Sequence, residues 1–169
     1  MSGSPESMDR RIIRAIEFLS RRLKYGRTKW ALIGSTSLAI QGVKVSPNDI
    51  DVLTDREGAF KIAKLLEKYQ VRRLAFRRSD RFQSYFAEYR IQGIKVQVAG
   101  DMKIRYGGRW TSLLGRLESR TRVRVGRSMI PISSLREQLL SYQKLGRRED
   151  RAKIRKIRKV LSQRSGLLT

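Results

Sequence analysis

Hydrophobic and polar residues follow two different periods along the chain. Apolar residues that return every three or four positions, together with capping signals, indicate helices. The predicted helices are Met8–Lys24, Ser35–Gln41, Thr54–Tyr69, Ser134–Tyr142 and Glu149–Gln163. Segments that alternate, or that form brief apolar runs, are typical of strands. The predicted strands are Lys29–Ile33, Asp49–Leu53, Val71–Phe76, Ser84–Arg90, Ile94–Ala99 and Thr121–Val125.

Two short motifs mark helix starts. Thr54 with Glu57, and Ser134 with Glu137, have the spacing of a capping box, in which a hydroxyl accepts a free N–H of the first turn. On the helix after Thr54, the residues expected to face the core are Phe60, Ala63, Leu66 and Tyr69 or their neighbours.

Strands and helices alternate over most of the chain, which is typical of the α/β (α+β) class. We expect a mixed β-sheet flanked by helices, followed by a C-terminal helical hairpin. Pro131 is the expected join, so the predicted units are a flexible tail (1–7), an α/β domain (8–130) and the hairpin (131–169). Within the α/β domain, Asp101–Arg120 is expected to be irregular, with a short helix near Thr111–Leu117.

The composition narrows the chemistry. The 169 residues include no cysteine and no histidine, which excludes disulfides, thiolate or imidazole metal ligands, and cysteine or histidine catalysts. Lys and Arg number 39 against 15 Asp and Glu, a formal net charge of +24. This excess favours a polyanionic partner such as nucleic acid, although solubility or heat tolerance also favours charged surfaces. No apolar run approaches the roughly 20 residues of a membrane span, and the N-terminus has no signal-peptide core, so we expect a cytoplasmic protein.

The segment Trp30–Asp55 holds the candidate chemistry. A buried strand is followed at Gly34 and Ser35 by a helix, whose first N–H groups and the Ser35 hydroxyl suit a phosphate. Asp49 and Asp51 lie two apart on the next predicted strand, so both carboxylates occupy one face. Adjacent carboxylates repel each other and favour a bound cation, and oxygen ligands beside phosphates indicate Mg²⁺ or Mn²⁺.

A Gly-Ser pair or an Asp-x-Asp pair alone is usually structural, but the combination is more specific. Ile33-Gly34-Ser35 followed by Asp49-Ile50-Asp51-Val52 resembles the signature of the DNA polymerase β-like nucleotidyltransferase superfamily, and residues 131–150 resemble the helical tail of its small stand-alone members. The resemblance implies a nucleotidyltransferase fold and Mg²⁺-dependent transfer of a nucleoside monophosphate from an NTP to a hydroxyl acceptor. It also implies that Asp49 and Asp51 are catalytic and hold the metal, and that Gly34 and Ser35 bind the nucleotide phosphates.

The sequence departs from this family at one important position. Members usually carry a third Asp or Glu on a later strand, and the matching strand here, Ile94–Val98, has Gln97 there. A glutamine offers an amide oxygen but no charge and no base. Glu88 and Asp101 are the carboxylates considered as substitutes. Two rival hypotheses therefore stay open: a catalytically degenerate module that binds nucleic acid, and one component of a toxin–antitoxin-like pair.

Basic residues gather in three regions, Arg72–Arg81, Arg105–Arg127 and Arg147–Lys159. Nine basic and two acidic residues lie between Arg147 and Arg164. Such a run is either a solvated helix face or a surface for a nucleic acid, for example an RNA acceptor. The candidate nucleic-acid-binding residues are Arg155, Lys156 and Lys159.

Overall fold

The computed structural model describes residues 8–25 and 27–166, and a mixed sheet of eight strands forms its centre. The strands are β1 (Trp30–Ile33), β2 (Asp49–Thr54), β3 (Gln70–Arg78), β4 (Phe82–Ile91), β5 (Ile94–Tyr106), β6 (Arg109–Ser112), β7 (Thr121–Val125) and β8 (Ser128–Ile132). Seven strands follow the order β3-β4-β5-β2-β1-β8-β7, and β6 pairs with the C-terminal part of β5. The β2–β5 and β1–β8 pairs are parallel, and the other pairs are antiparallel.

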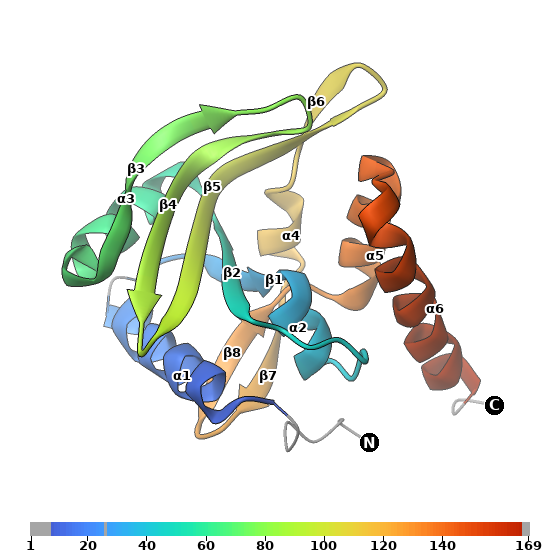
Figure 1. Ribbon diagram of the computed structural model, residues 1–169, viewed down its shortest axis with the longest axis horizontal. Helices are drawn as coiled ribbons and strands as arrows, with labels where there is room; N and C mark the ends of the chain where they lie inside the picture. Colours follow the sequence, from blue (N-terminus) through green and yellow to red (C-terminus); the bar gives the residue numbers. More distant parts are fainter. Residues whose placement is uncertain (1–7, 26, 167–169) are drawn as a thin grey trace.

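Helices cover both faces of this sheet (Figure 1). They are α1 (Arg10–Tyr25), α2 (Gly34–Ile40), α3 (Arg56–Leu65), α4 (Gly115–Glu118), α5 (Leu135–Leu145) and α6 (Arg151–Gly166). The α1 and α3 helices pack on one face, whereas α2, α4, α5 and α6 lie on the other. The predicted class, a mixed sheet flanked by helices with helices at the C-terminus, is confirmed.

The largest buried cluster lies under α1. Five aliphatic residues of α1 pack there against the apolar residues of β2 and β5, and burial of each large side chain contributes about 1.5–3 kcal/mol. The buried members from these elements are Ile12, Ala15, Ile16, Leu19, Leu23, Ile50, Val52, Ile94, Val96 and Val98. Because side chains alternate along a strand, this packing turns Asp49 and Asp51 to the opposite face of the sheet.

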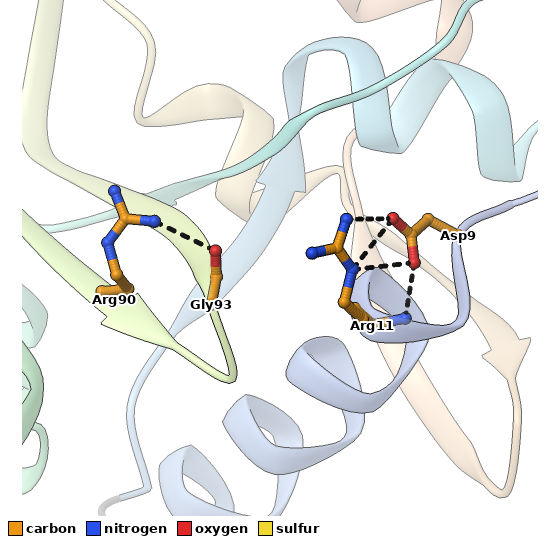
Figure 2. A network of polar contacts seen from close by, with 4 residues as sticks. All are labelled: Asp9, Arg11, Arg90 and Gly93. Carbon is orange, nitrogen blue, oxygen red and sulfur yellow. Dashed lines mark hydrogen bonds and ion pairs between the residues drawn. The ribbon is translucent and has the colours of Figure 1, made fainter.

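Local hydrogen bonds hold the start of α1 and the β4–β5 turn (Figure 2). The Asp9 carboxylate accepts the backbone N–H of Arg11 at 2.9 Å and its guanidinium at 2.9 Å. In the turn, Arg90 Nη1 donates to the Gly93 carbonyl at 3.0 Å. Gln92 and Gly93 both have positive φ, 52° and 79°, which confirms the hairpin predicted at this pair.

The structure corrects the predicted start of α3. Thr54 belongs to β2, and its Oγ1 donates to the Lys29 carbonyl at 2.6 Å. The N-cap is Asp55, whose Oδ1 accepts the Gly58 N–H at 2.6 Å. The capping box predicted at Thr54 and Glu57 is therefore wrong, because a carboxylate one residue further along meets the free N–H.

The predicted inner face of α3 is also partly wrong. Phe60 is 47% exposed, and its ring lies 5.8 Å from that of Tyr85. The buried side of the helix carries Ala59 and Ile62 instead. The α-helix ends at Leu65 and a 3₁₀ turn, Glu67–Tyr69, follows it.

Two strand predictions need correction. Asp101–Arg120, expected to be irregular, continues β5 to Tyr106 and returns as β6, and α4 confirms the short helix expected near its end. The prediction places the join between two units at Pro131 and no strand there, whereas the structure has β8 (Ser128–Ile132). Pro131 pairs with Arg122 of β7.

The two C-terminal helices agree with their prediction. Ser134 Oγ accepts the Glu137 N–H at 3.2 Å, and α5 ends at Gly146, whose φ is 59°. Helix α6 packs Ile157 against α2 and α5. The division at Pro131, which itself lies in β8, stays a prediction, and the tail predicted over residues 1–7 lies outside the described residues.

Candidate active site

The turn from β1 into α2 brings the backbone of Gly34 against Asp51. Gly34 has a φ of +74°, a left-handed conformation that glycine adopts readily. A Cβ atom at this position would lie 2.5 Å from Asp51 Oδ2. Position 34 therefore has to be a glycine for the carboxylate to occupy its place.

Asp49 and Asp51 share the face of β2 that was predicted for them. The intervening Ile50 is fully buried on the α1 side, whereas both aspartates are partly exposed. The Thr36 hydroxyl donates to the Asp49 carbonyl, which ties α2 to the start of β2. Lys95 Nζ lies 3.9 Å from Asp49 Oδ2, a long ion pair between two partly exposed groups.

Burial, together with the neighbouring charge of Asp49, raises the pKa of Asp51 to about 7, although Lys153 and Lys95 act in the opposite direction. A carboxylate that resists ionisation in the absence of a cation gains from binding one. The pair therefore fits a divalent ion on its own chemistry.

A row of polar side chains extends from Asp51 across the sheet. Asp51 pairs with Gln97 of β5, and Gln97 pairs with Glu88 of β4, so the three side chains share one face. Gln97 Nε2 donates to Glu88 Oε1 at 3.4 Å. Asp101 lies within the irregularity between the Tyr85–Gly100 and Gln83–Lys103 pairs, outside this row, and neither Asp101 nor Glu88 lines the cavity described below. Of the two substitutes considered for the third carboxylate, Glu88 is the one in this row.

Asp51 and Gln97 of this row border a cavity of about 510 Å³, whereas Glu88 lies outside its lining. One side is formed by Gly34, Ser35, Asp51 and Gln97 of the sheet and of α2. Basic side chains from β3, from α4, from the α5–α6 connection and from α6 close the other sides. Those cations are Arg72, Arg77, Arg78, Arg116, Arg147 and Lys153.

Gln138 of α5 joins the two sides. Its Oε1 accepts the Gly34 N–H at 3.0 Å, and its Nε2 donates to Ser37 Oγ at 2.6 Å and to the Ser133 carbonyl at 3.0 Å. The Gly34 N–H, predicted to face a phosphate, is therefore bonded to protein in this state.

The structure brings together some of the predicted site residues. Gly34, Ser35 and Asp51 line the cavity, and Asp49 stands two residues before Asp51 on the same face. The predicted nucleic-acid face does not reach this cavity, because its residues are exposed along α6. These are Arg155, Lys156 and Lys159. Lys153, one turn earlier on α6, does line it.

Sequence reasoning missed the contribution of α5 and α4 to this site. Gln138, Ser141 and Tyr142 have the spacing of the inward face that starts at Leu135, so polar residues on a buried stripe were the available signal. For Arg116 of α4, a basic region was noted but nothing in the sequence marked this residue as buried.

A metal ion would have Asp49 and Asp51 as its carboxylate ligands. Within residues 8–25 and 27–166, no cluster of three or more acidic, cysteine or histidine side chains suited to a metal is found. Two carboxylates are enough for Mg²⁺, which commonly keeps water molecules and takes phosphate oxygens from its substrate. In the described part of the chain, no helix is long and apolar enough to cross a membrane.

Comparison with known proteins assigns the chain to a protein family. The sequence profile of the aminoglycoside-2''-adenylyltransferase family matches residues 15–157. The structure is similar to that of the Thermotoga maritima protein TM1012, a candidate nucleotidyltransferase, with 33% identity and a TM-score of 0.79 over 88% of this chain and 93% of that one.

Two more distant structures share the fold. The lincosamide antibiotic adenylyltransferase LnuA, solved with lincomycin, is 14% identical with a TM-score of 0.58, over 87% of this chain and 96% of that one. An antigenic nucleotidyltransferase-like protein from Paracoccidioides brasiliensis is 16% identical with a TM-score of 0.54, over 92% and 77%. No curated protein sequence matches the chain significantly. The chain therefore belongs to the aminoglycoside-2''-adenylyltransferase family and is an enzyme of the small, polymerase β-like nucleotidyltransferase type.

Proposed function

We propose that the protein transfers a nucleoside monophosphate from a nucleoside triphosphate to a hydroxyl group, using Mg²⁺ or Mn²⁺ held by Asp49 and Asp51. The observation that carries this proposal is the convergence of Gly34, Ser35 and Asp51 on one cavity whose other charged wall residues are cations. A triphosphate brings several negative charges, and basic side chains around a carboxylate-bound divalent ion neutralise them.

The side chains divide the work of the reaction. The acceptor oxygen forms a bond to the α-phosphorus while the bond to pyrophosphate breaks, and the acceptor proton is lost to a base. When bound, the metal ion supplies Lewis-acid polarisation of the reacting oxygens. Asp49 and Asp51 hold that ion, Gly34 leaves space for the Asp51 carboxylate, and the Ser35 hydroxyl donates to a phosphate oxygen.

Glu88 is the proposed base, and Gln97 positions it. The row Asp51–Gln97–Glu88 places a carboxylate on the reacting face, two strands away from Asp51. The Gln97 amide donates to the Glu88 carboxylate at 3.4 Å and so positions it. General-base help from such a group typically contributes about 10² to 10⁴ in rate.

An anionic acceptor, RNA in the first instance, fits the charge of the site better than a cationic one. Aminoglycosides, named in the family description, are polyamines whose binding needs carboxylates. Among the described residues that line the cavity, Asp51 is the one carboxylate, against six cations. The exposed face of Arg155, Lys156 and Lys159 on α6 offers further contacts for a phosphate backbone.

The test pairs metal binding with transfer. Asp49→Asn and Asp51→Asn should each lower Mn²⁺ and Mn²⁺–ATP affinity by at least tenfold in calorimetry, while Asp101→Asn, which lies off the cavity, keeps both. Wild-type protein should move label from α-³²P-NTP to an RNA oligonucleotide and not to an aminoglycoside. Equal Mn²⁺ binding in all variants contradicts the metal assignment. Tight binding of NTP and RNA without transfer favours the binding-only module.

A further inference from the structure

Arg116 is a buried cation beside the proposed catalytic cavity. It lies on the short helix α4, between β6 and α5, and only 6% of its surface is exposed. Arginine is rarely buried to this extent unless an anion accompanies it, because removing a guanidinium from water is costly.

No anion in the described part of the chain forms an ion pair with Arg116, although the charge of Glu137 acts on it from a greater distance and favours its charged form. Arg116 Nη2 donates to the Glu137 carbonyl at 2.9 Å, and no carboxylate of residues 8–25 and 27–166 lies within ion-pair distance of its guanidinium. Its Nε has no hydrogen-bond partner among these residues. Burial lowers the pKa of Arg116 to about 10, so the group is still charged at neutral pH.

Arg147, another basic residue of the cavity, forms a direct ion pair with a carboxylate, which Arg116 does not. Its Nε lies 2.7 Å from Asp150 Oδ2 and its Nη2 lies 3.0 Å from Asp150 Oδ1. Asp150 is completely buried, so this pair is a built-in structural ion pair. The contrast indicates that the partner of Arg116 comes from outside the chain.

The neighbours of Arg116 place that external partner at the Gly34 end of the cavity. Arg116 contacts Glu137, the residue directly before Gln138, and Gln138 bonds to the Gly34 N–H. Arg116, Gly34 and Ser35 all line the same cavity. The site therefore combines a desolvated guanidinium fork with the glycine-serine turn.

We propose that Arg116 is the anchor for a phosphate group, and that this group belongs to the terminal phosphates of the nucleotide, which leave as pyrophosphate. The assignment rests on the proposed function and adds to it a residue for the leaving group. As the bond between the α-phosphorus and the bridging oxygen breaks, the electron pair stays on pyrophosphate. A guanidinium can neutralise the resulting charge with two parallel hydrogen bonds.

The probes are inorganic pyrophosphate, ATP, AMP and an RNA oligonucleotide, measured by calorimetry on the full chain. Arg116→Gln should weaken pyrophosphate and ATP at least tenfold and AMP less than threefold, and Arg116→Lys should fall between wild type and Arg116→Gln. Arg136→Gln, which removes an exposed arginine of the neighbouring helix α5, should bind all four probes like wild type.

A stability measurement separates this role from a structural one. Arg116→Met removes a buried charge that has no ion pair among the described residues, so the ligand-free melting temperature should stay equal or rise, whereas a fixed concentration of pyrophosphate should raise the melting temperature of wild type more than that of the variant. A lower ligand-free melting temperature with unchanged ATP and pyrophosphate affinity would overturn the proposal and make Arg116 structural. If Arg116→Gln lowers the affinity for RNA and not the affinity for ATP, the phosphate bound by Arg116 belongs to the acceptor and the proposal is wrong. Wild-type protein that binds no ATP at all would instead overturn the proposed function.

Discussion

The backbone N–H of Gly34 and the side-chain carbonyl of Gln138 are 3.0 Å apart, although 104 residues separate them in the chain. This hydrogen bond ties the C-terminal helix α5 to the turn that carries the candidate phosphate site. Any ligand that takes the Gly34 N–H has to displace Gln138 from it.

Gln138→Leu should destabilise the protein by roughly 1–3 kcal/mol, because the buried Gly34 N–H, Ser37 hydroxyl and Ser133 carbonyl lose a partner. The free energy of unfolding in urea measures this effect. Gln143→Leu, at an exposed position of the same helix, is the control and should change stability little. Equal effects of the two substitutions would contradict a linking role for Gln138.

Gly34→Ala should disturb the metal site. The added Cβ would lie 2.5 Å from Asp51 Oδ2, so the carboxylate must move, and we expect Mn²⁺ affinity to fall at least tenfold. Gly108→Ala is a matched control, since Gly108 has a φ of +75° and no atom within 4 Å of an added Cβ. Both substitutions carry the backbone cost of a left-handed alanine, about 1–2 kcal/mol, but only Gly34→Ala should lose metal. Loss of Mn²⁺ in both, or in neither, would refute the contact as the cause.

The pKa of Asp51 predicts how the stability of metal-free protein depends on pH. Its folded-state pKa of about 7 lies above the ordinary value of 3.8, so the folded state holds this proton more tightly than the unfolded state. The stability that the folded state gains from this tighter proton binding is complete below about pH 4 and is lost as pH rises through about 7. Asp51→Asn cannot ionise. We compare the free energy of unfolding of this variant with that of wild type in EDTA. The difference in favour of the variant should therefore be larger at pH 8 than at pH 5, by roughly 2 kcal/mol. A difference that is the same at both pH values would exclude the raised pKa.

Gln97→Glu tests the missing third carboxylate. The new charge would stand beside Asp51 and Glu88, so metal-free protein should lose stability while Mn²⁺ affinity and transfer rate rise. Glu88→Gln should slow transfer by about 10² or more if Glu88 is the base, and Asp101→Asn should leave the rate unchanged. A rate that falls with Asp101→Asn and not with Glu88→Gln would reverse this assignment.

The exposed basic face of α6 makes a prediction about salt. Replacing Arg155, Lys156 and Lys159 with Gln should reduce the salt dependence of RNA binding, because each phosphate contact to a single strand contributes a slope of about −0.7. The control removes the same charge from α1 on the other face of the sheet, through Arg10, Arg14 and Arg21. Parallel salt curves for the two triple variants would indicate that only net charge matters.

Local patterns in the sequence were enough for the parts of the fold that depend on neighbouring residues. The alternation in Asp49–Leu53 placed both carboxylates on one face, and the structure has them there because Ile50 and Val52 must be buried. The Ser134 cap and the Gly146 end of α5 were equally readable, since both are satisfied within one helical turn. Thr54 was misread as a cap because its hydroxyl is engaged by Lys29, a residue 25 positions away.

Long-range pairing decided what the sequence left undetermined. Pro131 was expected to join two units, yet it lies in a strand, because β8 pairs with β1 in parallel and with β7 in antiparallel orientation. The sequence by itself determined the Gly34-Ser35 turn and the Asp49–Asp51 pair, because both depend on local backbone geometry. Only the tertiary structure decided that Gln138 holds Gly34, that Glu88 stands in the row of Asp51, and that Arg116 is buried without an ion pair among the described residues. Burial and contact between segments about 40 to 100 residues apart arise from sheet order and helix packing, which no local pattern of side chains encodes.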